Sequence, residues 1–309
     1  MTALNMIGLN CKGMNKWGEW EALMREAKRE RVNVLTLQEL NVRPDMVDQF
    51  KRRATNLDFD ACISCSDSAA CRGGTGVLVR RGFAATQAVV DSTRGDTLGG
   101  GLCVVDIDLR GETLRAASLY VPSSSWARGR FLEKLEQCQD IGPDTVLQGD
   151  MNCAVAAPAA DEVRANGACR GSDPHGLKLE SILRRKGLRD AYRLLHGRNA
   201  CEFTRVCDTV SRRLDRLYVP VHDGLIRWSV VRADQKFHRE RKRRSDHYAL
   251  HATGSWCTVE NVKKERRIRP EVMKRPEVRE KVVQIITAIY SRMPPSQHGH
   301  ALPWRVMKE

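Results

Sequence analysis

The sequence predicts an α/β domain built in layers, with mixed β-sheets covered by helices. Short apolar runs of strand length recur along the chain, some joined by tight turns and others separated by segments with helical spacing. The chain has 309 residues with 41% hydrophobic content, which is enough for a substantial core. No apolar run approaches the roughly 18 residues of a membrane span, so we expect no membrane association.

The first half of the chain combines both kinds of connection. Helices are expected at 16–30, where apolar residues recur every three or four positions, and at 44–55, where Pro44 suits a first helical turn. The predicted strands are 4–10, 32–39, 60–65, 74–82, 83–91, 101–109 and 113–122. A tight link at 110–112 predicts that the last two strands form a hairpin.

The second half continues the alternation of strands and helices. Helices are expected at 124–141, after serine caps, and at 177–187, before Gly187. The predicted strands are 144–150, 213–220, 227–233 and 246–252, and residues 156–176 are expected to form a loop. We predict a domain over 1–254, followed by a basic, proline-punctuated segment over 255–309 that is either a linker or a helical appendage.

The positive charge is concentrated late in the chain. The net charge is +14, and residues 232–244 hold seven Lys and Arg against two acids. Residues 255–309 hold twelve Lys and Arg against six acids. Such an excess attracts polyanions, nucleic acid first. A solvated basic loop or a nuclear-import segment is the alternative that charge alone leaves open.

The cysteines indicate a reducing compartment. There are 11 Cys, an odd number, and residues 1–10 lack the pattern of a secretory signal. We therefore expect a nuclear or cytoplasmic protein that is not secreted. Cys62, Cys65 and Cys71 are clustered but lack a fourth ligand at zinc-finger spacing, which favours ordinary thiols over a zinc site.

Polar residues stand at the ends of several predicted strands. In "LQGDMNCAV" the strand finishes with Asp150 and Asn152, two positions apart, so their side chains point the same way on extended backbone. The other residues of this kind are Asn10, Glu39, Tyr120, Asp215, Asp246 and His247. Each alone has an ordinary explanation as a turn or rim residue. Their recurrence favours a common site.

The residue types in this set suit phosphodiester hydrolysis. Glu39 and Asn10 offer the oxygen ligands that Mg²⁺ prefers. Asp150 can act as base or orienting acceptor for a water molecule, with Asn152 beside it.

The developing negative charge needs donors. His247 and Tyr120 can supply them, and Asp215 is the natural carboxylate to fix the tautomer and charge of His247.

Six motifs in order carry a resemblance to a known family. They are GLNCKG, LTLQEL, SLYVPSS, LQGDMN, FTRVCDTVSRRLDRLYV and SDHYAL, and the resemblance extends from about residue 4 to 254. The chain resembles the endonuclease/exonuclease/phosphatase superfamily, which includes DNase I and abasic-site endonucleases. The resemblance implies a DNase I-like, four-layer α/β/β/α sandwich of two mixed sheets flanked by helices.

The resemblance also implies roles for the residues. Asn10, Glu39 and Asp246 would lie at the metal, and Tyr120 and His247 at the phosphate. Asp150 and Asn152 would position the water, Asp215 would pair with His247, and Thr204 would support the site. One departure is Lys12, which stands where abasic-site endonucleases carry an acid near the metal.

Within the superfamily, the segments GLRDAYRLLH and SRRLDRLYV look most like the endonuclease domain of non-LTR retrotransposons. This implies a monomeric Mg²⁺-dependent endonuclease, with Mn²⁺ as a substitute, that nicks DNA and leaves 3′-hydroxyl ends. A reverse transcriptase of the parent element is the implied partner. The basic residues expected to hold DNA phosphates are Arg239, Arg241, Lys242, Arg243 and Arg244. The alternatives are a phosphatase or RNase of the same superfamily, or an inactive relic that only binds nucleic acid.

Overall fold

The computed structural model describes most of the region before residue 257. The described residues are 2–14, 16–65, 73–83, 98–109, 112–155, 161–164, 173–221, 226–237 and 245–256, and later in the chain 276, 277, 280 and 284. Contacts divide the chain into Met1–Cys257 and Thr258–Glu309. The expected domain over 1–254 and the segment over 255–309 stay predictions.

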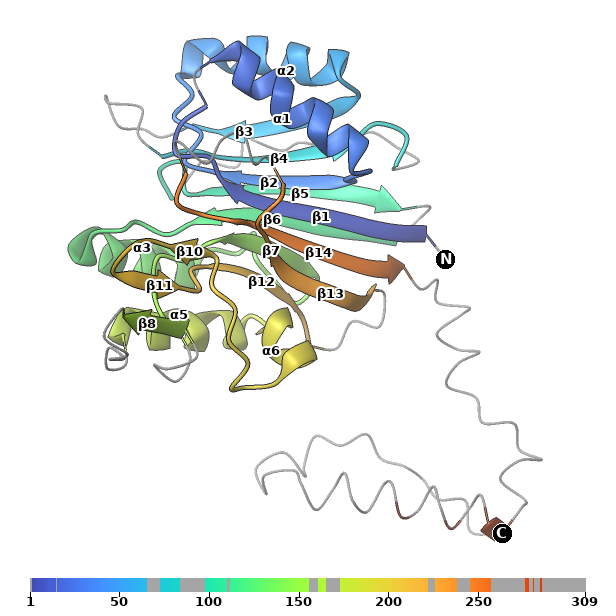
Figure 1. Cartoon of the computed structure of the whole chain (residues 1–309), viewed down its shortest axis with the longest axis vertical. Helices are drawn as coiled ribbons and strands as arrows, with labels where there is room; N and C mark the ends of the chain where they lie inside the picture. The colour runs from blue at the N-terminus through green and yellow to red at the C-terminus, as the bar shows by residue number, and fades with distance from the viewer. Residues whose placement is uncertain are drawn as a thin grey trace. The chain divides into compact units, whose positions relative to one another are not determined.

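The first sheet has six strands in the order β13-β14-β1-β2-β4-β3 (Figure 1). Their bounds are β1 Thr2–Asn10, β2 Val34–Gln38, β3 Phe59–Ser64, β4 Thr75–Arg80, β13 Ile226–Asp234 and β14 Ala249–Trp256. β1 is parallel to β2 and antiparallel to β14, so this sheet is mixed. At the centre of the sheet, the first described strand, β1, pairs with the last, β14.

The second sheet has five strands in the order β5-β6-β7-β12-β9. Their bounds are β5 Leu102–Leu109, β6 Glu112–Tyr120, β7 Thr145–Asp150, β9 Leu188–Asp190 and β12 Asp215–Pro220. β5 and β6 pair antiparallel from Leu109↔Glu112 onward, which confirms the predicted hairpin. β6 and β7 are parallel, so this sheet is mixed as well.

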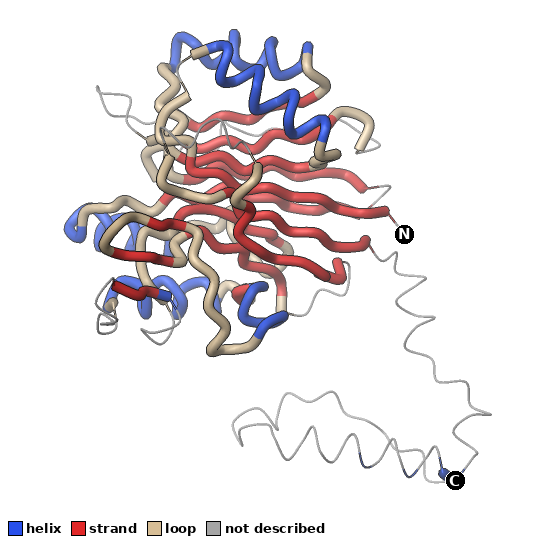
Figure 2. Tube along the Cα trace, in the orientation of Figure 1, coloured by secondary structure: helices blue, strands red, loops and turns tan. Residues whose placement is uncertain are grey.

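Helices cover the outer face of each sheet, which completes four layers (Figure 2). The bounds are α1 Trp17–Arg29, α2 Val47–Asn56, α3 Ser125–Gln137 and α5 Pro174–Arg185. α1 and α2 share a core with the first sheet, α3 and α5 share one with the second, and a third core lies between the sheets. The predicted four-layer sandwich is confirmed.

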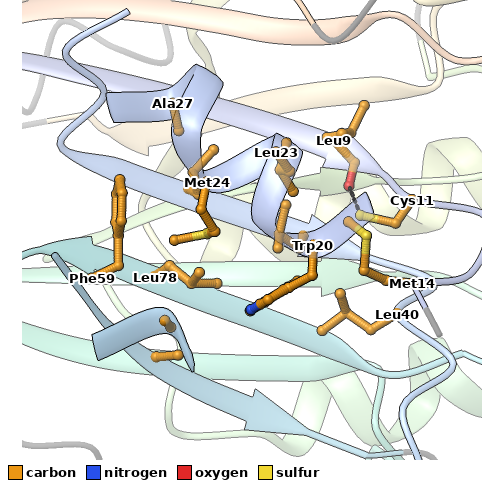
Figure 3. Packing of buried hydrophobic residues seen from close by; sticks show 14 of the residues in the cluster. Leu9, Cys11, Met14, Trp20, Leu23, Met24, Ala27, Leu40, Phe59 and Leu78 are labelled. Carbon is orange, nitrogen blue, oxygen red and sulfur yellow. Dashed lines mark hydrogen bonds between the residues drawn. The ribbon is translucent and has the colours of Figure 1, made fainter. Parts of the chain in front are cut away.

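The spacing of apolar residues explains why α1 packs as it does. Trp20, Leu23 and Met24 are fully buried and come from one face of the helix. Figure 3 shows them directed at the sheet, with Phe59 and Leu78 opposite. Burying side chains of this size stabilises the fold by about 1.5–3 kcal/mol each, which holds the strand ends beneath the helix in place.

Two buried glutamines join the sheets. Gln148 of β7 accepts a hydrogen bond from Thr36 Oγ1 at 3.0 Å and donates one to Leu250 O at 2.7 Å. Gln38 of β2 donates to Ser118 Oγ of β6 at 2.9 Å. Because these buried side chains hydrogen-bond across the gap, they fix how the two sheets face each other, and we call the pair Gln38 and Gln148 the glutamine bridge.

The structure differs from expectation in the predicted loop and in several short elements that were not predicted. Residues 156–176 include strand β8 (Glu162–Arg164), which joins β10 (Arg205–Val206) and β11 (Val210–Arg212) in a small third sheet. These strands are too short to show a periodic pattern. A short helix, α6 (Ala191–His196), was also not predicted. The predicted strand at 83–91 lies almost wholly outside the described residues.

Membrane crossing by a helix finds no support in the structure. Among the described residues, no helix combines the length and apolar character that a span requires.

Candidate active site

Strand pairing gathers the predicted polar residues at one edge of the two sheets. Asn10 ends β1 and pairs with Gln38, which ends the parallel strand β2. Glu39 directly follows Gln38. Tyr120 ends β6 opposite Asp150, which ends the parallel strand β7, and Asp215 faces Asp150 from β12. The carboxyl ends of parallel strands lie at the same edge of a sheet, so these polar side chains lie close together.

Asp150 is the hub of the hydrogen bonds. Its Oδ2 accepts from Asn10 Nδ2 at 2.8 Å and from Asn152 Nδ2 at 3.2 Å. Its Oδ1 accepts from the Asn152 backbone N–H at 2.9 Å. Asn10 Nδ2 also donates to Glu39 Oε1 at 2.9 Å, so one amide links two carboxylates from different sheets. These bonds hold Asp150 in a single orientation.

His247 is paired with Asp215 as predicted. The two side chains meet at Nδ1···Oδ2, 2.8 Å, and His247 Nε2 lies 3.9 Å from Asp150 Oδ2. Burial opposes protonation of His247, but Asp215 and then Asp150 outweigh it and raise the pKa of His247 to about 9. The imidazole is therefore a cation at neutral pH, with both ring nitrogens as donors.

Asp150 titrates closer to neutrality than an ordinary aspartate. Burial raises the pKa of Asp150 to about 6, while the His247 cation opposes this shift and Asp215 adds to it. A base is most effective when its pKa lies near the working pH. Asp150 thus has the position, orientation and basicity to accept a proton from a water molecule.

Tyr120 and Glu39 form the neighbouring part of the site. Burial, followed by the nearby Glu39 and Asp150 carboxylates, raises the pKa of the Tyr120 hydroxyl above its usual range. Tyr120 is therefore neutral and can donate a hydrogen bond to a negatively charged oxygen. Both residues are half-buried, so a ligand can reach them.

Left-handed backbone at three residues shapes the site. Lys12, Glu39 and Asn152 have φ of 49°, 50° and 47°. This conformation is uncommon for residues other than glycine and costs of order 1 kcal/mol or more. Strained backbone of this kind gathers at functional sites because the surrounding contacts hold it there.

Two hydroxyls support the pairing of His247 with Asp215. Thr204 Oγ1 accepts from the Asp215 backbone N–H at 2.9 Å, and its supporting role stays a prediction. Ser245 Oγ donates to Asn10 O at 3.0 Å and accepts from the His247 backbone N–H at 3.2 Å. The sequence analysis gave Ser245 no role, although it opens the SDHYAL motif.

Asp246 is held by two cations. Lys12 Nζ lies 2.9 Å from Asp246 Oδ1, and Arg205 Nε lies 2.6 Å from Asp246 Oδ2. Although burial opposes ionisation, Lys12 and Arg205 hold the pKa of Asp246 below its usual range. Sequence reasoning missed Arg205, and the prediction that Asp246 lies at a metal stays a prediction.

The residues offer two places for a divalent cation. Ligand atoms of Asp150, Asp215 and His247 lie within 4.8 Å of one another. A protonated imidazole cannot ligate a metal, however, and Asp215 Oδ2 already accepts a hydrogen bond from the His247 imidazole. Glu39 supplies a hard carboxylate ligand without that conflict, and the amide oxygen of Asn10, which accepts from the Lys12 backbone N–H at 3.0 Å, lies on the same side chain that donates to Glu39. The donor set at Glu39 therefore fits Mg²⁺ better.

A second buried charged cluster lies beside the site, and we call it the arginine network. Its members are Asp161, Asp190, Arg193, Arg213 and Arg216. Asp161 Oδ1 accepts from Arg213 Nε at 3.0 Å, and its Oδ2 accepts from Arg216 Nη2 at 2.7 Å. Arg213 and Arg216 bracket Asp215 in the sequence, so the network fixes the start of β12.

The predicted DNA-contacting residues cannot be placed. Arg239, Arg241, Lys242, Arg243 and Arg244 lie outside the described residues. The nearest described part of that segment is Ser245–His247, which is bonded into the site.

Solved structures share the fold of this chain, whereas neither protein-family models nor curated sequences match it. The endonuclease domain of TRAS1, a telomere-specific non-LTR retrotransposon, has a TM-score of 0.57 at 15% identity, covering 81% of this chain and 97% of its own. AP endonuclease LMAP from Leishmania major has a TM-score of 0.62 at 16% identity, covering 82% and 87%.

A third similar structure was solved with DNA. The 3′ phosphatase NExo from Neisseria, bound to a product DNA hairpin, has a TM-score of 0.60 at 17% identity, covering 82% of this chain and 100% of its own. The chain therefore shares the fold of these solved structures, which agrees with the DNase I-like fold that its motifs predict.

Proposed function

We propose that this protein is a metal-dependent phosphodiesterase that nicks DNA and leaves 3′-hydroxyl ends. The observation that carries the proposal is the buried cluster in which Asp215 fixes a cationic His247 at 2.8 Å beside the basic Asp150 carboxylate. The cluster lies where strand ends of the two sheets meet, and this position suits a substrate that approaches from solvent.

The residues divide the work on a scissile phosphate. Asp150 accepts the proton of the attacking water, and Asn10 and Asn152 hold its carboxylate in position. His247 donates from Nε2 to a phosphate oxygen, because its Nδ1 is held by Asp215. Tyr120 adds a neutral donor.

The expected cofactor is Mg²⁺, with Mn²⁺ as a substitute. Glu39 and Asn10 would hold it, and it would neutralise charge on the phosphate and leaving oxygen when bound. Asp246 remains a proposed neighbour of this position. Its pairing with Lys12 and Arg205 predicts that it acts through those cations.

The finer assignment is a retrotransposon-type endonuclease. It is supported by the GLRDAYRLLH and SRRLDRLYV segments and by the similar fold of the TRAS1 endonuclease domain. The net charge of +14 suits DNA as partner, with the basic residues at 239–244 as phosphate contacts. Under this proposal the protein acts as a monomer in the nucleus or cytoplasm, alongside a reverse transcriptase of the parent element.

Plasmid relaxation tests the proposal. Wild type should convert supercoiled plasmid to nicked circles with Mg²⁺ and not with EDTA, and Asp150→Ala and His247→Ala should lose this activity. Asp144→Ala and His196→Ala are matched controls, since Asp144 precedes β7 at its other end and His196 ends α6. Extension of the nicks by a DNA polymerase would demonstrate 3′-hydroxyl ends.

A substrate panel separates the alternatives. Activity on RNA, inositol phosphates or a 3′-phosphate-terminated oligonucleotide, with intact plasmid, would contradict DNA nicking and favour the phosphatase or RNase. Folded wild type that binds DNA but cleaves nothing would favour the inactive relic.

A further inference from the structure

Trp126 is exposed to a degree that packing does not explain. It is the second residue of α3, and 74% of it is accessible to solvent. Tryptophan normally buries most of its surface, because the indole is large and apolar. The guanidinium of Arg130 lies over the indole ring, 5.0 Å from its centroid. The pair thus presents a flat aromatic face with a positive charge next to it.

The chain holds Trp126 close to the active site. It follows Tyr120 by six residues, which span at most about 20 Å even when extended. The connecting segment is tied down, since Arg128 Nε donates to Pro122 O at 3.1 Å and Asn152 Nδ2 donates to Val121 O at 2.8 Å. At 3.4 Å per nucleotide, Trp126 is within about six nucleotides of a phosphate at Tyr120.

The surroundings of Trp126 favour a polyanion. The first turn of α3 has no acidic residue, and residues 123–126 and Arg130 are all exposed. The backbone N–H groups at the start of the helix add partial positive charge. Arg128 is committed elsewhere, because it is largely buried against Asp173 at 3.3 Å, which leaves Arg130 as the exposed cation.

We infer that Trp126 and Arg130 form a nucleobase-stacking site for the DNA strand that flanks the scissile phosphate. This inference rests on the proposed function and adds the substrate contact. An indole stacks on any base, because every base has a π-face, and the guanidinium strengthens the contact. The site would hold an unstacked base and set which base steps are cleaved.

DNA affinity without catalysis tests the inference directly. With the full chain in EDTA and a short fluorescein-labelled duplex, Trp126→Ala should weaken binding about 5- to 150-fold, the equivalent of about 1–3 kcal/mol for one stacked base. Trp126→Phe keeps the π-face and should stay within about threefold of wild type. Trp126→Leu keeps only the apolar character and should bind as weakly as Trp126→Ala.

The salt dependence separates stacking from charge. Trp126→Ala should leave the slope of log affinity against log salt unchanged, whereas Arg130→Ala should reduce its magnitude by about one phosphate contact. DNA should also quench tryptophan emission in wild type, and Trp126→Phe should lose that quenching.

Leu194→Ala is the matched control. Leu194 is 58% exposed on α6, which follows β9, the strand that pairs with the end of β12 away from Asp215 (Figure 1). It should bind DNA like wild type. Equal affinity of Trp126→Ala and wild type overturns the inference, as would a Trp126-dependent affinity for anionic phospholipid vesicles with DNA binding unchanged.

The failure of the proposed function has a different signature. Folded wild type that does not nick plasmid, yet shows the predicted Trp126 dependence of DNA binding, contradicts the activity and supports the stacking site. Wild type that nicks plasmid, with Trp126→Ala binding DNA equally well, contradicts the stacking site alone.

Discussion

Two buried charged clusters lie next to each other at the start of β12, and they differ in charge balance. The arginine network has three guanidiniums for two carboxylates, and each oxygen of Asp161 and Asp190 accepts hydrogen bonds. The cluster of the candidate site, formed by Asp150, Asp215 and His247, has two carboxylates for one imidazole. Asp215 Oδ1 has no hydrogen-bond partner among the described residues.

This difference separates a structural cluster from a reactive one. Although burial opposes ionisation of Asp190, Arg213 and Arg216 hold its pKa below the usual range, so it stays charged. The pKa of Asp150 is raised instead, to about 6, because burial is not compensated in the same way. Asp190 therefore stays ionised in the arginine network, whereas Asp150 can gain and lose a proton near neutral pH.

The largest predicted effect is the loss of activity in Asp150→Asn. Removing the base should slow nicking by about 10²–10⁴-fold. The unfolding free energy at pH 8 should be unchanged or higher, because the variant removes an unfavourable buried charge. Nicking rates and urea titrations measure the two effects. A nicking rate within tenfold of wild type would refute the role of Asp150.

Asp161→Asn is the matched substitution in the arginine network. Asp161 is as fully buried as Asp150, but its loss leaves the three guanidiniums of the network with the single carboxylate of Asp190. The unfolding free energy should fall by about 3–5 kcal/mol, as measured by urea titration. If Asp161→Asn and Asp150→Asn had the same stability, the contrast between the clusters would be wrong.

The pH dependence of stability sharpens the comparison. The pKa of His247 is raised to about 9 from 6.5, so its contribution is full below pH 6.5 and is lost as pH rises through 9. The loss is at most about 3 kcal/mol. Urea titrations in EDTA at pH 6.5 and 9 should show a smaller difference for His247→Gln than for wild type. His196→Gln, the control, should keep the wild-type difference.

The smallest predicted effect concerns the pair of Lys12 and Asp246. Lys12 is half-exposed, so Lys12→Ala should change the unfolding free energy by about 0–1 kcal/mol. Lys12→Asp replaces a cation by an acid near Glu39 and Asn10, and it should lower the Mg²⁺ concentration for half-maximal nicking by up to about fivefold. Mg²⁺ titrations of both variants check this. A higher Mg²⁺ requirement in Lys12→Asp would contradict it.

Much of the site could be predicted because strand ends are local signals. A polar residue directly after an apolar run indicates a sheet edge, and this reasoning brought Asn10, Glu39, Tyr120 and Asp150 together before any coordinates. The partner of Lys12 could not be predicted in this way. It is Asp246, 234 residues away, and nothing in a local pattern relates the two loops.

The arginine network was missed for a related reason. Asp161 lies in a stretch that reads as a polar loop, and strands β8, β10 and β11 are two or three residues long. A buried ion pair and a solvated one have the same composition, so burial is visible only once the sheets are assembled. The basic residues at 239–244 remain a prediction.

The candidate site is complete only after the two sheets have docked at the glutamine bridge. Asn10 ends β1 of the first sheet, and His247 lies two residues before β14 of that sheet, whereas Asp150 and Asp215 come from the second sheet. β1 completes its pairing only with β14, near residue 256. During synthesis, therefore, β1 can pair with β2 early, but its other edge stays unpaired until almost the whole domain has been made. In refolding, the rate at which activity returns would therefore report the docking of the sheets. We expect this step to be slower than the formation of helices measured by spectroscopy.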